Sequence, residues 1–192
     1  MIDEAIPSYI SMGIDFGGNN SAHAFVTCSI KRDYSEVVVL RSDRTEIVDD
    51  IHTKLKQLKS AFKKHLLFIL NKYGKIDVIW ADCAEQVLIS ALQEVLDEIG
   101  ISIPIRNSVK TPINSRIYAI NMLLMIKKIK FIKGDTNSVI EALQQAVQDP
   151  NENEDRWLDD GTSDIDTIDA FNYGIEYWYK QILKLILGGS DE

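Results

Sequence analysis

Residues 10–18 read ISMGIDFGG, an apolar run that closes on an aspartate and a pair of glycines. The run predicts a β-strand over residues 10–16, followed by a turn at Gly17–Asn20. Asp15 stands out, because a carboxylate in an apolar strand is unfavourable unless it is paired or binds a cation. The glycines after it would let a ligand approach the backbone closely. Asp15 is therefore a candidate cation ligand, and the alternative is a carboxylate that caps the turn.

Two other stretches place aspartates in comparable settings. Asp82 follows the apolar run 76–81, and Asp166 and Asp169 open a helix-like segment, three residues apart. A helix puts such a pair on one face, where the like charges repel unless a cation lies between them. Carboxylate oxygens are the ligands that Mg²⁺ or Mn²⁺ prefers, and a pair of such ions can organise phosphodiester cleavage. We therefore predict that these acids converge with Asp15 on one metal site.

Several neighbouring residues allow both a structural and a functional interpretation. Asp82 suits the N-cap of a helix that begins near Ala84, and one carboxylate can both cap and coordinate. Glu85 falls in the first turn of that helix, where it complements the helix dipole or reaches the site. His23 either lies near Asp15, as an outer neighbour of the site, or has a structural role.

The 192-residue chain has a net charge of −8, with 45% hydrophobic and 26% charged residues. This balance predicts one domain, residues 1–192, with a sizeable core. No apolar run approaches the roughly 20 residues of a membrane span, and the acidic N-terminus lacks a secretory signal, so a cytosolic setting is expected. Cys28 lies within one strand-like run and Cys83 lies at the end of another, and we predict that both are buried thiols.

The acidic balance argues against a simple basic nucleic-acid binder. A bound divalent ion would reverse the sign locally, so DNA contacts are expected from the ion and from nearby basic residues. The candidates are Arg106, Lys110, Arg116, Lys127 and Lys128, together with Lys130 and Lys133. For each of them alone, a solvated surface position is the alternative.

The order of the predicted elements defines the fold class. Strands are predicted over residues 10–16, 23–30, 34–40, 76–81 and 101–105, with helices over 45–71 and 84–99. This order predicts an α/β fold with a mixed five-stranded sheet, three antiparallel strands and then two parallel ones, flanked by helices. The first and fourth strands would be neighbours, which would bring Asp15 and Asp82 together.

The second half of the chain is predicted to be mainly helical. Helices are expected over residues 112–127, 137–147 and 165–187, with a short strand or extended piece at 129–132. Pro112 suits a first helical turn, with Thr111 as its N-cap. The acidic stretch 148–164 is expected to be an exposed loop and 188–192 a tail.

Motifs of several other classes are absent. The chain has no G-x-x-x-x-G-K-[ST] phosphate loop and no G-x-S-x-G elbow. Asp15–Gly17 matches the kinase metal motif, but no other kinase motif accompanies it. Residues 14–18 also resemble the phosphate-binding opening of actin-like sugar kinases, whose second phosphate loop is missing here.

Three motifs together resemble those of one family. They are residues 13–25 (GIDFGGNNSAHAF), 82–86 (DCAEQ) and 166–173 (DTIDAFNY). They look like the acidic motifs of the nuclease domain in large terminase subunits of tailed phages. The match covers residues 10–180, in the family's order and with helices between the motifs.

The resemblance implies an RNase H-like fold and a two-metal endonuclease that cuts double-stranded DNA concatemers during phage genome packaging, with little sequence specificity. It makes Asp15 and Asp82 metal ligands. The family's last motif has two versions, which assign the remaining ligand to Asp169 or to Asp166. We favour Asp169, with Asp166 as an outer or second-metal group.

The same resemblance implies partners and a setting. Full-length members carry an N-terminal packaging ATPase and work with a portal and a small terminase subunit in the host cytoplasm. The chain then looks like an excised nuclease domain or a prophage fragment, with residues 1–8 as a remnant of the interdomain segment. A Holliday-junction resolvase, which shares the fold and the acidic site, and a metal-free packaging module are the alternatives.

Overall fold

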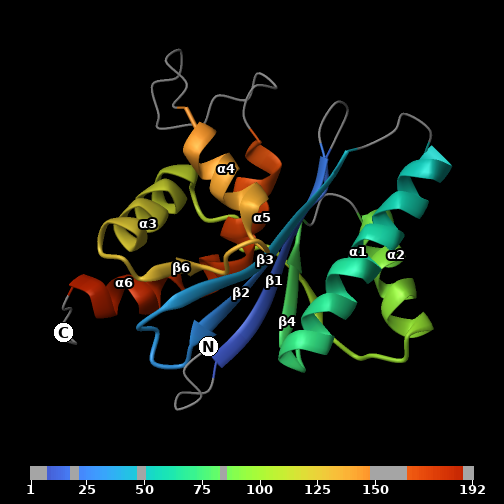
Figure 1. Cartoon of the computed structure of the whole chain (residues 1–192), viewed down its shortest axis with the longest axis horizontal. Coiled ribbons are helices and arrows are strands. Elements are labelled where there is room, and N and C mark those ends of the chain that lie inside the picture. Colours follow the sequence, from blue (N-terminus) through green and yellow to red (C-terminus); the bar gives the residue numbers. More distant parts are fainter. Residues whose placement is uncertain (1–7, 18–21, 47–50, 83–85, 148–163, 188–192) are drawn as a thin grey trace.

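The computed structural model describes residues 8–17, 22–46, 51–82, 86–147 and 164–187, and these form a sheet with helices on both faces (Figure 1). The strands are β1 (Ser8–Asp15), β2 (Ala22–Lys31), β3 (Val37–Glu46), β4 (Val78–Ala81), β5 (Ile105–Asn107) and β6 (Ile129–Phe131). The helices are α1 (Ile51–Tyr73), α2 (Gln86–Glu98), α3 (Ile113–Met125), α4 (Asn137–Gln145), α5 (Ile165–Ile175), the 3₁₀ turn η1 (Glu176–Trp178) and α6 (Tyr179–Leu187).

The sheet has the strand order β5-β4-β1-β2-β3-β6. β1, β2 and β3 form an antiparallel meander, β4 is parallel to β1, and β5 is parallel to β4. The predicted mixed α/β fold is confirmed, and so is the prediction that the first and fourth strands are neighbours. The sheet has one strand more than predicted, because the piece at 129–131 pairs in parallel with β3.

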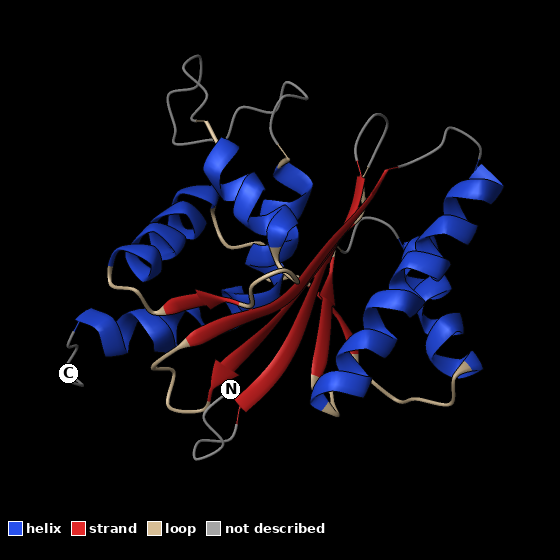
Figure 2. Cartoon of the chain, viewed as in Figure 1, coloured by secondary structure: helices blue, strands red, loops and turns tan. Residues whose placement is uncertain are grey.

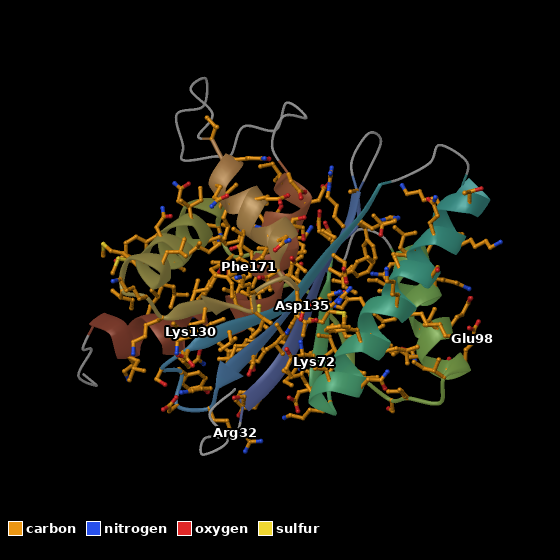
Figure 3. All side chains as sticks on the ribbon, in the orientation of Figure 1. Arg32, Lys72, Glu98, Lys130, Asp135 and Phe171 are labelled. Atoms are coloured by element: carbon orange, nitrogen blue, oxygen red, sulfur yellow. The ribbon has the colours of Figure 1, made fainter. Side chains whose placement is uncertain are left out.

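Different helices bury the two faces of the sheet (Figure 2). α1 and α2 cover one face, where Met12 and Ile14 of β1 are fully buried. α3, α4, α5 and α6 cover the other face, where Phe171 of α5 is fully buried against the sheet (Figure 3). Because side chains alternate along a strand, Gly13 and Asp15 face α5 while Ile14 faces α1. None of the described helices is long and apolar enough to cross a membrane.

The predicted boundaries fall in part outside the described residues. Residues 1–7, 148–163 and 188–192, and with them most of the expected remnant, loop and tail, lie outside them, as do Cys83 and Glu85. Ser8 already belongs to β1, so the predicted remnant was one residue too long. Cys28 is buried, as predicted.

β3 continues six residues past the predicted end at Leu40, so α1 begins at Ile51 and not at Thr45. The second half of this strand is polar, and polarity hid it from a pattern based on apolar residues. β3 is nevertheless paired along its whole length with β2, from Ala22 opposite Glu46 to Ile30 opposite Val37.

The polar half of β3 is stable because its side chains find partners. Asp43 accepts a hydrogen bond from Nη2 of Arg41 at 2.8 Å and hydrogen-bonds Nδ1 of His65, on α1, at 2.7 Å. Nε2 of the same ring hydrogen-bonds the Thr27 hydroxyl at 2.8 Å. Since His65 and Thr27 are fully buried, this chain of polar groups fixes α1 against β2 and β3.

The prediction of one continuous helix over residues 165–187 is wrong. Ile175 has a φ of −128°, far from helical values, and the chain tightens into a 3₁₀ turn before α6 begins. Glu176, the first residue of that turn, is buried, and its carboxylate accepts hydrogen bonds from the N–H groups of Lys110 and Thr111. Thr111 was also wrongly predicted as the N-cap of α3. Pro112 is the cap residue, and its carbonyl accepts the first helical bonds.

A contact between two backbones places α5 on the sheet. A Cβ built on Gly13 would lie 1.9 Å from the Ala170 carbonyl oxygen and 2.4 Å from the Gly174 nitrogen. β1 and α5 therefore touch through their main chains, with no side chain between them. For a Cβ built on Gly174, the nearest atom would be the Gly13 nitrogen, at 3.3 Å.

We expect Gly13→Ala to lower the free energy of unfolding by about 3 kcal/mol or more, because the added methyl group meets backbone that cannot move aside. Gly174→Ala is the matched control and should change stability by less than about 1 kcal/mol, since the gain in helix propensity offsets the tighter contact. Urea denaturation followed by tryptophan fluorescence measures both values. Equal losses in the two variants would contradict the backbone-contact interpretation.

Candidate active site

The acidic site forms where β1 and β4 end side by side. Asp15 is the last residue of β1, Asp82 directly follows β4, and Ile14 pairs with Ala81 in the parallel register. The carboxyl ends of parallel neighbours meet at one edge of a sheet. α5 lies against the sheet on the side away from α1 and α2 (Figure 1), and its first turns bring the two remaining acids to the same edge.

Asp15 and Asp166 share a hydrogen bond between their side chains. Asp166 also accepts a hydrogen bond from the Ala22 N–H at 2.8 Å. Burial, followed by the negative charges of Asp169, Asp166 and Asp82, raises the pKa of Asp15 well above its usual value. Burial also raises the pKa of Asp166. Two carboxyl groups can share a hydrogen bond only when one of them is protonated, and the raised pKa values of both favour that form when no cation is bound.

Asp169 and Asp82 are each paired with a base. Nη1 of Arg116 donates to Oδ1 of Asp169 at 2.7 Å, and Nζ of Lys110 lies 2.7 Å from Oδ1 of Asp82. Burial raises the pKa of Asp169 to about 6 despite the attraction of Arg116, and Asp166 adds to the rise by repulsion. The two bases therefore neutralise the cluster only in part.

The four acids interact, but their side chains do not enclose one point. Within the described ranges, no group of three or more His, Cys, Asp or Glu side chains is arranged to hold a metal ion. The donor set nevertheless fits one, because four carboxylates supply hard oxygen ligands and repel one another. Lys110 and Arg116 now engage oxygens that a divalent ion would use, so binding requires these side chains to turn away.

His23 lies on the opposite face of the sheet from the acids. Its ring packs edge-on to Phe16, with 6.3 Å between the ring centroids, and is almost completely buried. Burial, with a smaller effect from the charge of Lys54, lowers the pKa of His23 to about 4. The structure therefore does not bring His23 to the acidic site, while Glu85 lies outside the described residues.

Of the seven predicted DNA-contacting residues, three lie on the face of the acids. Lys110 and Arg116 touch the acids, and Arg106 is exposed and pairs in register with Trp80, which places it on the same face as Asp82. The other four lie elsewhere. Lys130 lies in β6, beside Val38 of β3, and Lys133 follows that strand, so neither is at the site. Lys127 and Lys128 precede β6, where the Lys128 carbonyl bonds the first residue of β3. The residue of β3 at the level of Asp15 is seven positions further on, roughly 20 Å away.

Sequence reasoning missed two acids that support the site. Asp164 caps α5 by accepting the Thr167 N–H at 3.2 Å, and it also pairs with Arg44 of β3 at 3.4 Å. Glu176 was not singled out at all. The available signal was its position as the only acid between Asp169 and Asp191, inside an apolar and aromatic stretch.

The strand order and the helix across β1 form the predicted RNase H-like fold, with the acids at the strand ends. No protein-family model matches the sequence, and neither does any curated protein. Its structural neighbours are consistently nuclease domains of large terminases, from several phages and from cytomegalovirus.

Three of these neighbours illustrate the likeness. The large terminase nuclease domain of bacteriophage SPP1, solved with bound Mn, is 22% identical with a TM-score of 0.61, over 88% of this chain and 86% of that one. The P22 large terminase nuclease domain is 15% identical with a TM-score of 0.62, over 93% and 86%. A large terminase from a thermophilic bacteriophage is 15% identical with a TM-score of 0.65, over 92% of this chain but only 40% of that one.

We expect Asp169→Asn to stabilise the ion-free protein at pH 8 by on the order of 2 kcal/mol, because the raised pKa makes the ionised form costly. Asp169 with a pKa of about 6 gains its proton in the folded state as the pH falls. The difference between variant and parent should therefore shrink from pH 6 to pH 4. Unfolding in urea with a chelator, across this pH range, measures it.

Asp43→Asn is the matched control with the opposite sign. Although burial opposes the shift, hydrogen bonds from His65 and Arg41 lower the pKa of Asp43 to about 2. Its ionised form thus stabilises the fold above pH 4 and loses that effect as the pH falls towards 2, so the variant should be less stable at pH 8. If both substitutions changed the free energy of unfolding at pH 8 in the same direction, the proposed charge balance would be refuted.

Proposed function

We propose that the chain is a metal-dependent endonuclease that cuts double-stranded DNA concatemers during viral genome packaging, with little sequence preference. The observation that supports this best is the meeting of Asp15, Asp82, Asp166 and Asp169 at one edge of the sheet, where burial and then the charges of the other three raise the pKa of Asp15. Such mutual repulsion destabilises the protein unless a cation offsets it. The fold of the terminase nuclease neighbours supports the same function.

Asp15, Asp82 and Asp169 would hold the ions, which we propose are two Mg²⁺ or Mn²⁺. Bound there, the ions would orient the scissile phosphate and activate water. Asp166 would act from outside, because its carboxylate is already engaged by the Ala22 N–H and by Asp15. Lys110 and Arg116, released from the acids, would face the phosphates. The Mn bound to the SPP1 domain, and the Mn soaked into a cytomegalovirus terminase nuclease domain, favour this choice of ion.

The proposed partners follow from the same neighbours. DNA would be the substrate, and a packaging ATPase domain of the same protein would precede this one, as the longer thermophilic phage terminase suggests. A portal and a small terminase subunit would complete the packaging assembly, in the cytoplasm of the bacterial host. Among the described residues, no separate element for reading bases accompanies the acidic site, which favours low sequence preference.

We expect the purified chain to cut supercoiled plasmid with Mn²⁺ or Mg²⁺ and to be inactive with a chelator. Asp15→Asn and Asp82→Asn should reduce cleavage to background, because each removes a ligand. Asp166→Asn should retain activity reduced about 10–100-fold, the usual cost of losing an outer group. Agarose-gel rates for the variants, with thermal melting as the control for folding, provide the test.

Three results would overturn these assignments. Plasmid left intact by the parent protein with both metals would exclude the nuclease and favour the packaging module. A strong preference for four-way junctions over linear duplex would favour the resolvase. If Asp166→Asn is inactive and Asp169→Asn active, the ligand is Asp166 and the domain follows the other version of the last motif.

We expect Arg106→Ala to weaken DNA binding and Lys128→Ala to leave it unchanged, although both remove one positive charge. Arg106 lies on the face of the acids, while Lys128 lies at the far end of the sheet. Losing one phosphate contact should reduce the slope of log affinity against log salt by about one. Fluorescence anisotropy with a labelled duplex and Asp15→Asn as parent measures both slopes. Equal slopes for the two variants would contradict this placement of the DNA.

A further inference from the structure

Glu176 is a buried acid whose two carboxylate oxygens are both used. Glu176 is 4% exposed, and the ring of the next residue, Tyr177, stacks on that of Trp80. Oε1 accepts the Lys110 N–H and Oε2 accepts the Thr111 N–H, each at 3.0 Å. A carboxylate this deeply buried costs several kcal/mol unless donors surround it, and here the donors are two consecutive backbone amides.

These two hydrogen bonds fix a segment that carries the bases of the site. Residues 108–112 connect β5 to α3, and the Ser108 N–H bonds the Ala81 carbonyl at 2.8 Å. Lys110 has a φ of +53°, a conformation that a residue with a side chain adopts only when its surroundings impose it. In this conformation the Lys110 ammonium lies 2.7 Å from Asp82.

The same segment also sets the start of α3. Pro112 caps the helix, and one turn later Arg116 pairs with Asp169 at 2.7 Å. A shift of residues 110–112 would therefore move both bases away from both acids. The hydrogen bonds of the Glu176 carboxylate go to the segment that carries both bases.

A purely structural role explains Glu176 less well. Its negative charge adds to the repulsion felt by Asp169, so the residue worsens the electrostatics of the cluster. A carboxylate suits this position because its two oxygens can accept hydrogen bonds from two backbone N–H groups at once.

We propose that Glu176 is a positioning residue of the active site, which holds the 108–112 segment so that Lys110 and Arg116 stand beside Asp82 and Asp169, from where they would face the phosphates once ions bind the acids. The inference rests on the proposed function for its effect on cleavage, but the positioning itself can be measured without DNA or metal. Glu176 thereby links the end of α5, which carries two of the acids, to the segment that carries the bases.

The decisive variant is Glu176→Gln, which keeps the shape but replaces one acceptor oxygen with an amide group that cannot accept. Amide ¹H–¹⁵N spectra of the ion-free protein should show large shifts at Lys110 and Thr111, and Mn²⁺-dependent cleavage should fall about tenfold. Glu98→Gln is the matched control, since Glu98 is an exposed acid on α2, at the far side of the molecule (Figure 3). It should leave both readouts unchanged.

A double-mutant cycle with Lys110→Met separates positioning from stability. If Glu176 acts through Lys110, Glu176→Gln should lower cleavage far less in the Lys110→Met background than in the parent. The proposal would be overturned if the two substitutions reduced cleavage by independent factors that multiply in the double variant. It would also be overturned if the amide signals of Lys110 and Thr111 did not shift in Glu176→Gln. If Glu176→Gln fails to fold, the same double-mutant cycle can be carried out with Glu176→Asp. This variant keeps the charge, but its carboxylate is one methylene further from the two amides. If the parent protein does not cut DNA, the proposed function fails, while the amide shifts still decide the positioning.

Discussion

The contact between the backbones of Gly13 and α5 is the constraint on which the site depends. Because no side chain separates the strand from the helix, α5 lies closer to β1 than ordinary packing allows. Its first turns then carry Asp166 and Asp169 down to the level of Asp15. A larger residue at position 13 would lift the helix and separate acids that come from sequence positions about 150 residues apart. The close contact at Gly13 thus determines how near the aspartates lie to one another at the ends of the strands.

That chemistry is a balance between repulsion and partial neutralisation. The carboxyl groups crowd together, burial and their mutual repulsion raise the pKa of Asp15, and Lys110 and Arg116 pair with Asp82 and Asp169. Both responses are reversible, because a carboxyl group can lose its proton and the side chains of Lys110 and Arg116 can turn away from the acids. Elsewhere the chain binds its buried acids permanently, as in the hydrogen bonds from His65 and Arg41 to Asp43. The acids of the cluster can therefore exchange their present partners for a cation, whereas Asp43 is held by fixed partners within the fold.

The sequence was sufficient for the fold and the acids, and for physical reasons. Asp15 and Asp82 end apolar strands, which is rare enough to notice, and adjacent parallel strands must end together. It was insufficient where stability comes from specific partners. The polar half of β3 is held by cross-strand pairing and by His65, neither of which leaves an apolar pattern. Glu176 is held by two amides distant in sequence, and the remoteness of Lys127 and Lys128 follows only from the pairing of β6 with β3.

The two outer strands of the sheet have a consequence for assembly. β5 and β6 are three residues each, so each outer strand offers only a short length of open backbone. Long open edges invite another chain to add a strand, and short ones do not. Contacts with a further domain or another copy of the chain are therefore expected to use helix surfaces and loops. Such contacts are formed by side chains, so they can be strengthened or released without disturbing the hydrogen bonds of the sheet.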